Sequence, residues 1–369
     1  MPRLRAGPEA AAAMRRALAA LLLASATLFA GTPDLPTVRL GKVDYVNLED
    51  GATRLGLRLV RSVPDTTVML KSGAQPVARL VDQSRQIDLM GLRIFLGDPV
   101  KTRGDSFFIS RIDFQDRIVP RLRPDMCGTA PAVPHLIVID PGHGGPDPGG
   151  INKSLGTMEK TYTLDTSLRL KKLLEAAGFK VVLTRESDVD LSKPNRAEIA
   201  NVAGADFFVS VHYNVVQHDT TTTGVEVMLF PPATQWSADS WSPGQKVFVE
   251  DKQSPVNKFD VWNCVLGGAL HKRLLEALHD GDRGEKFEHL AVLRGLKCPG
   301  VLVEPAFISS NAEAAKLGTA AFRDTIAGAI FAGIQDYAAV IRSLHPPAVQ
   351  APAAGPAPRS QPTRPAAGP

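Results

Sequence analysis

The chain has 369 residues, of which 44% are hydrophobic and 22% charged, and its formal net charge is +4. This composition is typical of globular proteins and excludes a wholly disordered chain, and the length allows two domains. The first 26 residues contain four arginines and one glutamate, so about +1 remains beyond them. The charge therefore gives no reason to expect nucleic acid as a partner.

Residues 1–26 have the pattern of a cleaved signal peptide. The four arginines precede an apolar run at residues 17–23, and residues 24–26 (Ala-Ser-Ala) provide the small residues of a cleavage site. The apolar stretch is short for a membrane-spanning helix, and no later segment is longer and equally apolar. We therefore expect export to the periplasm or the extracellular space, with no stable membrane span after cleavage.

Residues 36–125 are expected to form a small β-rich accessory domain. Short apolar or alternating runs, such as residues 92–96 and 107–110, are separated by glycines. The stretch "VNLEDGATRLGLRL" also allows a short helix. The segment has no histidine and its carboxylates are scattered, so we assign it no chemistry. Residues 126–134, rich in proline and small residues, are the expected linker.

Residues 135–343 alternate between strand and helix patterns. Such alternation predicts an α/β domain with a mostly parallel sheet that helices cover on both faces. Residues 344–369 are rich in proline and alanine and predict a disordered tail. The expected strands are 136–140, 179–184, 206–212, 224–230 and 301–304, and the expected helices are 159–177, 195–203, 261–278 and 320–341.

One long connection, residues 231–260, fits neither pattern. Long loops within compact domains are usually lids, binding loops or disordered segments. Trp236 and Trp241 lie in this stretch, and exposing both would be costly. A lid over the functional site and simple packing on the surface are equally good interpretations.

Three candidate functional residues follow predicted strands. His143, His212 and Glu304 come at the carboxyl ends of strands, where open α/β sheets gather their functional groups. Glu159 is a fourth candidate in the first turn of the helix that follows the glycine-rich loop. A strand-end histidine is more often hydrogen-bonded at the edge of a core, and a first-turn glutamate often only compensates the helix dipole.

Glu304 is harder to explain without a function. It follows three apolar residues, and a buried carboxylate is costly unless it is paired or coordinated. Two imidazoles and two carboxylates at one sheet edge suit a hydrolytic zinc ion, which takes three N/O ligands and leaves one position for water. The fourth residue is then available as a base.

Several motifs occur here in the order found in one known family. "IVIDPGHGGPDPGG", "GTMEKTYTLD", "LTRESDVDLSKPNRAEIANVAGADFFVSVHYN", "GVEVMLF" and "LRGLKCPGVLVEPAFISSNAEAAKL" resemble zinc-dependent N-acetylmuramoyl-L-alanine amidases of the amidase_3 type. The N-terminal domain loosely resembles copper-amine-oxidase-like accessory domains, although nothing in it suggests copper binding. The resemblance implies one Zn²⁺ per catalytic domain, held by His143, Glu159 and His212, with Glu304 as catalytic glutamate.

The resemblance also implies supporting residues and a reaction. Asn214 and Arg196 match positions that support the site or bind substrate, although Arg196 equally suits a structural salt bridge. Tyr213 and Pro305 depart from the family pattern without removing a chemical group, so activity is expected, while the shape of the pocket and the substrate preference stay open. The implied reaction is hydrolysis of the amide between N-acetylmuramic acid and L-alanine in peptidoglycan. A zinc peptidase acting within the stem peptide, and a noncatalytic or autoinhibited wall-binding protein, are the alternatives, and the need for a protein activator stays open.

Overall fold

The computed structural model describes residues 35–62, 66–232, 235 and 257–346. The expected signal peptide, both tryptophans of the long connection and nearly all of the expected tail lie outside these residues. Within the described part of the chain, no helix is both long and apolar enough to cross a membrane.

The N-terminal half contains two sheets around its own apolar core. A four-stranded antiparallel sheet has the order β1-β2-β9-β8, and α2 (Leu48–Arg54) follows β2, so the helical alternative for this stretch is confirmed. Asn47 caps α2, because its side chain accepts a hydrogen bond from the Glu49 backbone N–H. The strands of this half are β1 (Thr37–Leu40), β2 (Val43–Asn47), β3 (Arg58–Ser62), β4 (Thr67–Ser72), β5 (Gln75–Val81), β6 (Gln86–Leu89), β7 (Leu92–Phe95), β8 (Lys101–Arg103) and β9 (Ser106–Ser110).

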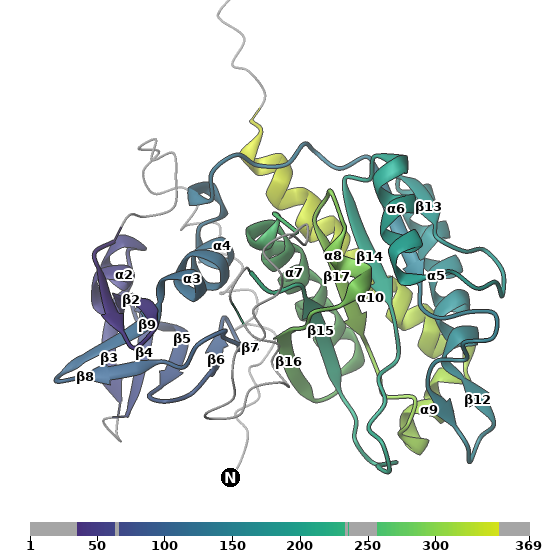
Figure 1. Cartoon of the computed structure of the whole chain (residues 1–369), viewed down its shortest axis with the longest axis horizontal. Coiled ribbons are helices and arrows are strands. Elements are labelled where there is room, and N and C mark those ends of the chain that lie inside the picture. The colour runs from purple at the N-terminus through teal and green to yellow at the C-terminus, as the bar shows by residue number, and fades with distance from the viewer. Residues whose placement is uncertain (1–34, 63–65, 233–234, 236–256, 347–369) are drawn as a thin grey trace, which may run out of the picture.

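The C-terminal half confirms the α/β prediction. Four parallel strands in the order β13-β10-β14-β17 carry apolar residues on both faces, as strands buried between helix layers do. Helices α5, α7 and α10 pack on one face, and α6 and α8 pack on the other (Figure 1). The elements are β10 (Leu136–Pro141), β11 (Ile151–Asn152), β12 (Thr157–Met158), α5 (Glu159–Ala176), β13 (Lys180–Leu183), α6 (Lys193–Ala203), β14 (Phe207–Val211), β15 (Val225–Leu229), α7 (Asp260–Leu278), β16 (Asp282–Phe287), α8 (Ala291–Arg294), β17 (Gly300–Glu304), α9 (Asn311–Leu317) and α10 (Ala320–Leu344).

The strand β15 reverses the direction of the sheet. It pairs antiparallel with β17, so that Glu226 lies opposite Glu304, and β16 then runs parallel to β15. The starts of β15 and β16 therefore lie at the same sheet edge as the ends of β10, β14 and β17. The strand β16 has no counterpart among the expected elements.

The two halves share one sheet. The strand β7 pairs parallel with β16, with Ile94 opposite Glu285, and the sheet continues through β6, β5 and β4 to β3. Figure 1 shows these strands side by side across the molecule. Short helical segments, α3 (Arg111–Asp113), a π-helical turn (Phe114–Ile118) and α4 (Val119–Leu122), bring Arg117 and Arg121 against this junction. The N-terminal half is thus fixed edge to edge to the α/β half.

The described ends of the long connection lie away from the predicted site. Phe230 follows β15 at the edge opposite Glu304, and the Gln235 side chain bonds to Asp113 of the N-terminal half. At the other end, the Asn257 side chain donates to the Leu293 carbonyl in α8. A lid would have to cross the length of β15 to reach the site, so the lid stays a prediction about residues outside the described part.

Candidate metal centre

His143 sits in an unusual backbone conformation directly after β10. Its φ of 60° lies in the left-handed region, which residues other than glycine rarely adopt. Two buried arginines hold the surrounding carbonyls: Arg196 donates to the His143 and Pro141 oxygens at 2.7 Å each, and Arg185 donates to the Gly142 oxygen at 2.7 Å. These bonds offset the strain and fix the direction of the imidazole.

Asp147 orients the His143 ring. Its Oδ2 lies 2.8 Å from His143 Nδ1, a distance at which an Nδ1–H donates to the carboxylate. The other nitrogen, Nε2, then points to Glu159 Oε2, 3.2 Å away. A carboxylate behind a histidine is the usual support of a metal-ligating imidazole.

Glu159 begins α5 and lies between the two histidines. Its Oε1 is 2.9 Å from His212 Nδ1 and accepts a hydrogen bond from the Tyr213 N–H, and its Oε2 accepts one from the Gly150 N–H at 2.7 Å. Burial alone would raise the pKa of Glu159, but the hydrogen bonds from His143 and His212 lower it below the usual range. Compensation of the helix dipole is therefore too weak an explanation for this residue.

Gly149 permits the close approach of these ligands. A Cβ at this position would lie 2.5 Å from His143 Cδ2 and 2.6 Å from Glu159 Oε2, and φ is +64°. Any larger residue would displace two ligands at once. The glycines of "GHGGPDPGG" therefore serve the packing of the ligands as well as the turn.

The three predicted ligands form a compact donor set. One ligand atom from each of His143, Glu159 and His212 lies within 4.8 Å of the others, and within the described residues this is the group found with metal-binding geometry. Two imidazole nitrogens and a carboxylate oxygen are the donor set of catalytic zinc sites. The residues present fit such an ion.

Glu304 lies beside this cluster with an unsatisfied oxygen. It ends β17, which pairs with β14, and directly after β14 the His212 N–H donates to the Val303 carbonyl. Its Oε2 is enclosed and has no hydrogen-bond partner among the described residues. Burial, then Glu159 and Glu226, raise the pKa of Glu304 well above its usual value. A bound dication would oppose this shift, and a water or substrate group would satisfy the oxygen.

The residues expected to support the site make different kinds of contact. Arg196 donates to the backbone oxygens of Pro141 and His143, and its Nη1 also donates to Asp140 Oδ1 at 2.8 Å. It therefore both holds the loop of His143 and forms a buried salt bridge. Asn214 donates to Glu226 Oε2 at 2.7 Å. The fully buried side chain of Tyr213 lies in the core, with its hydroxyl 2.5 Å from Thr166 Oγ1, and only its backbone N–H contacts the site, at Glu159.

Several residues of the site were not anticipated from the sequence. Asp147 had a usable signal, because it lies four residues after His143 in the same loop. Arg185 and Asp140 had none, since a buried arginine and a strand-end aspartate are ordinary in sequence terms. Glu226 lies in a strand that otherwise predicts only core packing.

A mostly parallel α/β sheet thus carries a His–Glu–His cluster, and beside it an unpaired glutamate, at one edge, and this combination suits a metal-dependent hydrolase. The family of N-acetylmuramoyl-L-alanine amidases, Amidase_3, matches residues 137–336, which is more than half of the chain. The chain therefore belongs to this family.

Two curated amidases and one solved structure are among the proteins similar to this chain. The sporulation-specific N-acetylmuramoyl-L-alanine amidase of Bacillus subtilis is 33% identical over 193 residues, which are 52% of this chain and 63% of the relative. The probable amidase AmiB of Haemophilus influenzae is 33% identical over 224 residues, 55% and 52% of the two chains. The chain thus spans between about half and two thirds of these curated relatives. An amidase structure from Clostridium difficile matches with 26% identity and a TM-score of 0.47, over 56% of this chain and 97% of the other.

Proposed function

We propose that the protein is an N-acetylmuramoyl-L-alanine amidase that hydrolyses the amide between N-acetylmuramic acid and the L-alanine of the stem peptide in peptidoglycan. The observation that carries this proposal is the cluster of His143, Glu159 and His212 beside the unpaired Glu304. Family membership over residues 137–336 supports the choice of bond.

The proposed cofactor is one Zn²⁺ held by the three clustered residues. When bound, zinc lowers the pKa of water to about 7 and polarises a carbonyl. Asp147 would keep the His143 ring oriented, and the buried arginines would hold its loop. Both imidazoles must be neutral to ligate, so acid is expected to release the metal.

Glu304 is the proposed general base and acid. Its enclosed oxygen would accept a proton from the attacking water as the new C–O bond forms at the lactyl carbonyl. The same proton would pass to the alanine nitrogen as the C–N bond breaks, which leaves a carboxylic acid on the sugar and a free amine on the peptide. One residue thus serves both proton transfers.

The proposed place of action is outside the cytoplasmic membrane. Peptidoglycan lies there, and the pattern of residues 1–26 is that of an export signal. The periplasm and the extracellular space use the same signal. A protein activator is a further proposed partner.

Mass spectrometry of digested peptidoglycan tests the proposal. Zinc-loaded protein is expected to release stem peptides with a free N-terminal alanine, and chelator-treated protein is expected to release none. Shortened peptides still attached to muramic acid would instead indicate a peptidase. Bound zinc without any product would indicate a noncatalytic wall-binding protein.

A further inference from the structure

A row of side chains crosses four neighbouring strands from the catalytic edge into the N-terminal half. Glu304 of β17 pairs with Glu226 of β15, and Glu226 pairs with Gly284 of β16. Ile94 pairs with Glu285, so its neighbour Arg93 in β7 lies beside Gly284. The row therefore joins the proposed base to an arginine of the accessory half.

Gly284 leaves a gap in this row that Arg93 occupies. Its φ is +100°, and a Cβ there would lie 3.2 Å from Arg93 Cγ and 2.7 Å from Phe95 Cε2. The stem of Arg93 thus lies across β16 in the direction of Glu226. The Arg93 side chain is exposed, and within the described residues its guanidinium makes no hydrogen bond or ion pair.

Arg283 is the second cation beside this row. Its Nε donates to Glu226 Oε1 at 3.1 Å, and its guanidinium lies 5.0 Å from the centre of the Phe307 ring. Its side chain is 40% exposed, and its Nη atoms bond to no described residue. Phe307 is three residues beyond Glu304, so Arg283 is held close to the proposed base with donors to spare.

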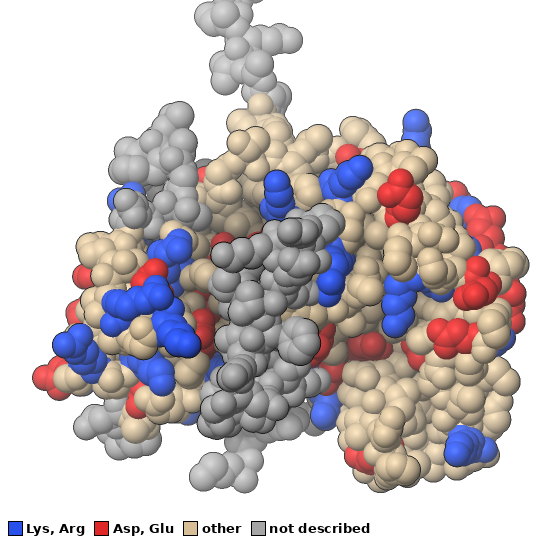
Figure 2. Space-filling view, viewed as in Figure 1, with Lys and Arg blue, Asp and Glu red and all other residues tan. Residues whose placement is uncertain are grey.

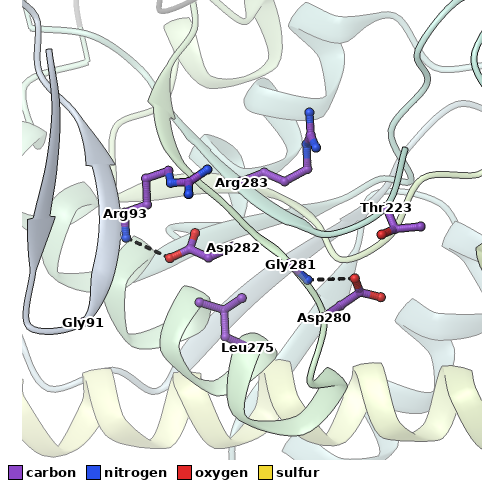
Figure 3. A pocket seen from close by; sticks show the side chains of 8 residues that line it. All are labelled: Gly91, Arg93, Thr223, Leu275, Asp280, Gly281, Asp282 and Arg283. Atoms are coloured by element: carbon purple, nitrogen blue, oxygen red, sulfur yellow. Dashed lines mark hydrogen bonds between the residues drawn. The ribbon is translucent and has the colours of Figure 1, made fainter. Parts of the chain in front are cut away.

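Both arginines line an open pocket of about 430 Å³ at the junction of the two halves. Figure 3 shows Arg93 extending from β7 towards β16, where Arg283 begins. The two aspartates of this pocket are engaged elsewhere: Asp282 accepts from the Arg93 backbone N–H, and Asp280 accepts from the Gly281 N–H and lies 3.7 Å from Lys316 Nζ. The pocket therefore offers free cationic donors.

Further cations lie on the N-terminal half. Figure 2 shows Lys and Arg side chains gathered over the strands of this half. The row itself continues through Asp88 to the exposed Arg79 of β5. Arg79 thus adds a third arginine to the row, with Asp88 between it and Arg93.

We propose that Arg93 and Arg283 bind a free carboxylate of the substrate's peptide and thereby determine preference for unamidated stem peptides. This inference rests on the proposed function, because it assigns the direction of the peptide within that site. Guanidinium groups bind carboxylates through short charge-assisted hydrogen bonds. The N-terminal half would then complete the substrate site.

The dimensions of the row suit such a peptide. Adjacent strands lie about 4.8 Å apart, so Arg93 begins roughly 14 Å from Glu304, and its side chain reaches back across Gly284. An extended peptide advances about 3.5 Å per residue. A carboxylate on the second or third residue after the scissile bond would therefore reach the two guanidinium groups.

The test compares Arg93→Ala with the wild type on two soluble probes. One probe is an N-acetylmuramoyl pentapeptide with free peptide carboxylates, and the other is the same molecule with those carboxylates amidated. Arg103→Ala, which removes an exposed arginine from β8 in the other sheet, is the matched control. Because one charged hydrogen bond is lost, kcat/KM on the free-acid probe is expected to fall about 10-fold through KM.

The outcomes separate the inference from the proposed function. On the amidated probe Arg93→Ala should equal the wild type, Arg103→Ala should be normal on both, and Arg93→Lys should recover part of the loss. Equal kcat/KM for Arg93→Ala and wild type on the free-acid probe would overturn the inference. If the wild type releases no peptide from either probe, the proposed function fails first.

Discussion

The loop that follows β10 concentrates strain and support around a single side chain. His143 adopts a left-handed backbone conformation, while Arg185 and Arg196 bind three successive carbonyls there, those of Pro141, Gly142 and His143. A strained backbone conformation of this kind persists only where surrounding contacts hold it in place. The loop is therefore best explained as a device that aims one imidazole.

Replacing Asp147 by asparagine tests how that imidazole is held. The carboxylate behind His143 fixes the ring and raises its basicity, so Asp147→Asn is expected to lower zinc affinity 10- to 100-fold. Competition with a zinc chelator measures the change. The control is Asp105→Asn, which alters a fully exposed carboxylate of the N-terminal half. Equal affinities in all three proteins would refute the orienting role.

Glu304→Gln separates metal binding from proton transfer. The amide has nearly the same shape but cannot accept the proton, so kcat is expected to fall by about 10²- to 10⁴-fold. Zinc content should stay at one equivalent, because Glu304 is not one of the three clustered residues. A variant with full zinc and near-normal kcat would show that another group is the base.

At the scale of elements, β16 is a strand of the main sheet that sequence patterns do not predict. Its sequence, "DRGEKF", has one apolar residue and a glycine, so neither alternation nor β-propensity reveals it. Its polar residues are satisfied by tertiary partners: Glu285 by Arg121, and Lys286 by Glu226. Those partners come from distant parts of the chain, which local patterns cannot detect.

Glu285 should make the stability of the protein depend on acid pH. Burial alone would raise the pKa of Glu285, but Arg121 and then His271 lower it to about 2. A carboxyl whose pKa is lower in the folded than in the unfolded protein stabilises the folded state. This contribution to the free energy of unfolding is complete above the pKa in the unfolded chain, near 4.3, and is lost as the pH falls towards 2. Glu285 thereby contributes about 3 kcal/mol to the free energy of unfolding at neutral pH.

Urea unfolding between pH 6 and 2 measures this contribution. Glu285→Gln is expected to show a shallower loss of unfolding free energy over that range than the wild type. It should also be less stable at pH 6, because Arg121 loses its buried partner. Glu175→Gln, at an exposed position in α5, is the control. Parallel pH curves for wild type and Glu285→Gln would contradict the assignment.

At the scale of the whole molecule, the two halves should behave as one cooperative unit. The shared sheet at β7 and β16 and the buried Arg121–Glu285 pair cross their boundary. We expect calorimetry of the intact chain to give a single unfolding transition whose calorimetric and van't Hoff enthalpies agree. Two well-separated transitions would show that the junction contributes little.

The sequence predicts the α/β half and the residues that meet at its site, but not the full order of strands in the sheet. Short apolar runs precede His212 and Glu304, and their alternation with helices predicts parallel strands. The convergence of the two side chains at one edge of the sheet was therefore predictable. The reversal of β15 and the continuation into the N-terminal half were not predictable, because strand order depends on long-range pairing. The arginines of that junction were missed for the same reason.

The central claim is that one zinc ion at His143, Glu159 and His212 enables hydrolysis of the muramoyl–alanine amide. The most direct measurement titrates metal-free protein with zinc while counting new N-terminal alanine amines released from peptidoglycan. Activity is expected to rise linearly and to level at one equivalent of zinc, and His212→Ala is expected to stay inactive throughout. Release of alanine amines without zinc, or undiminished release by His212→Ala, would contradict it.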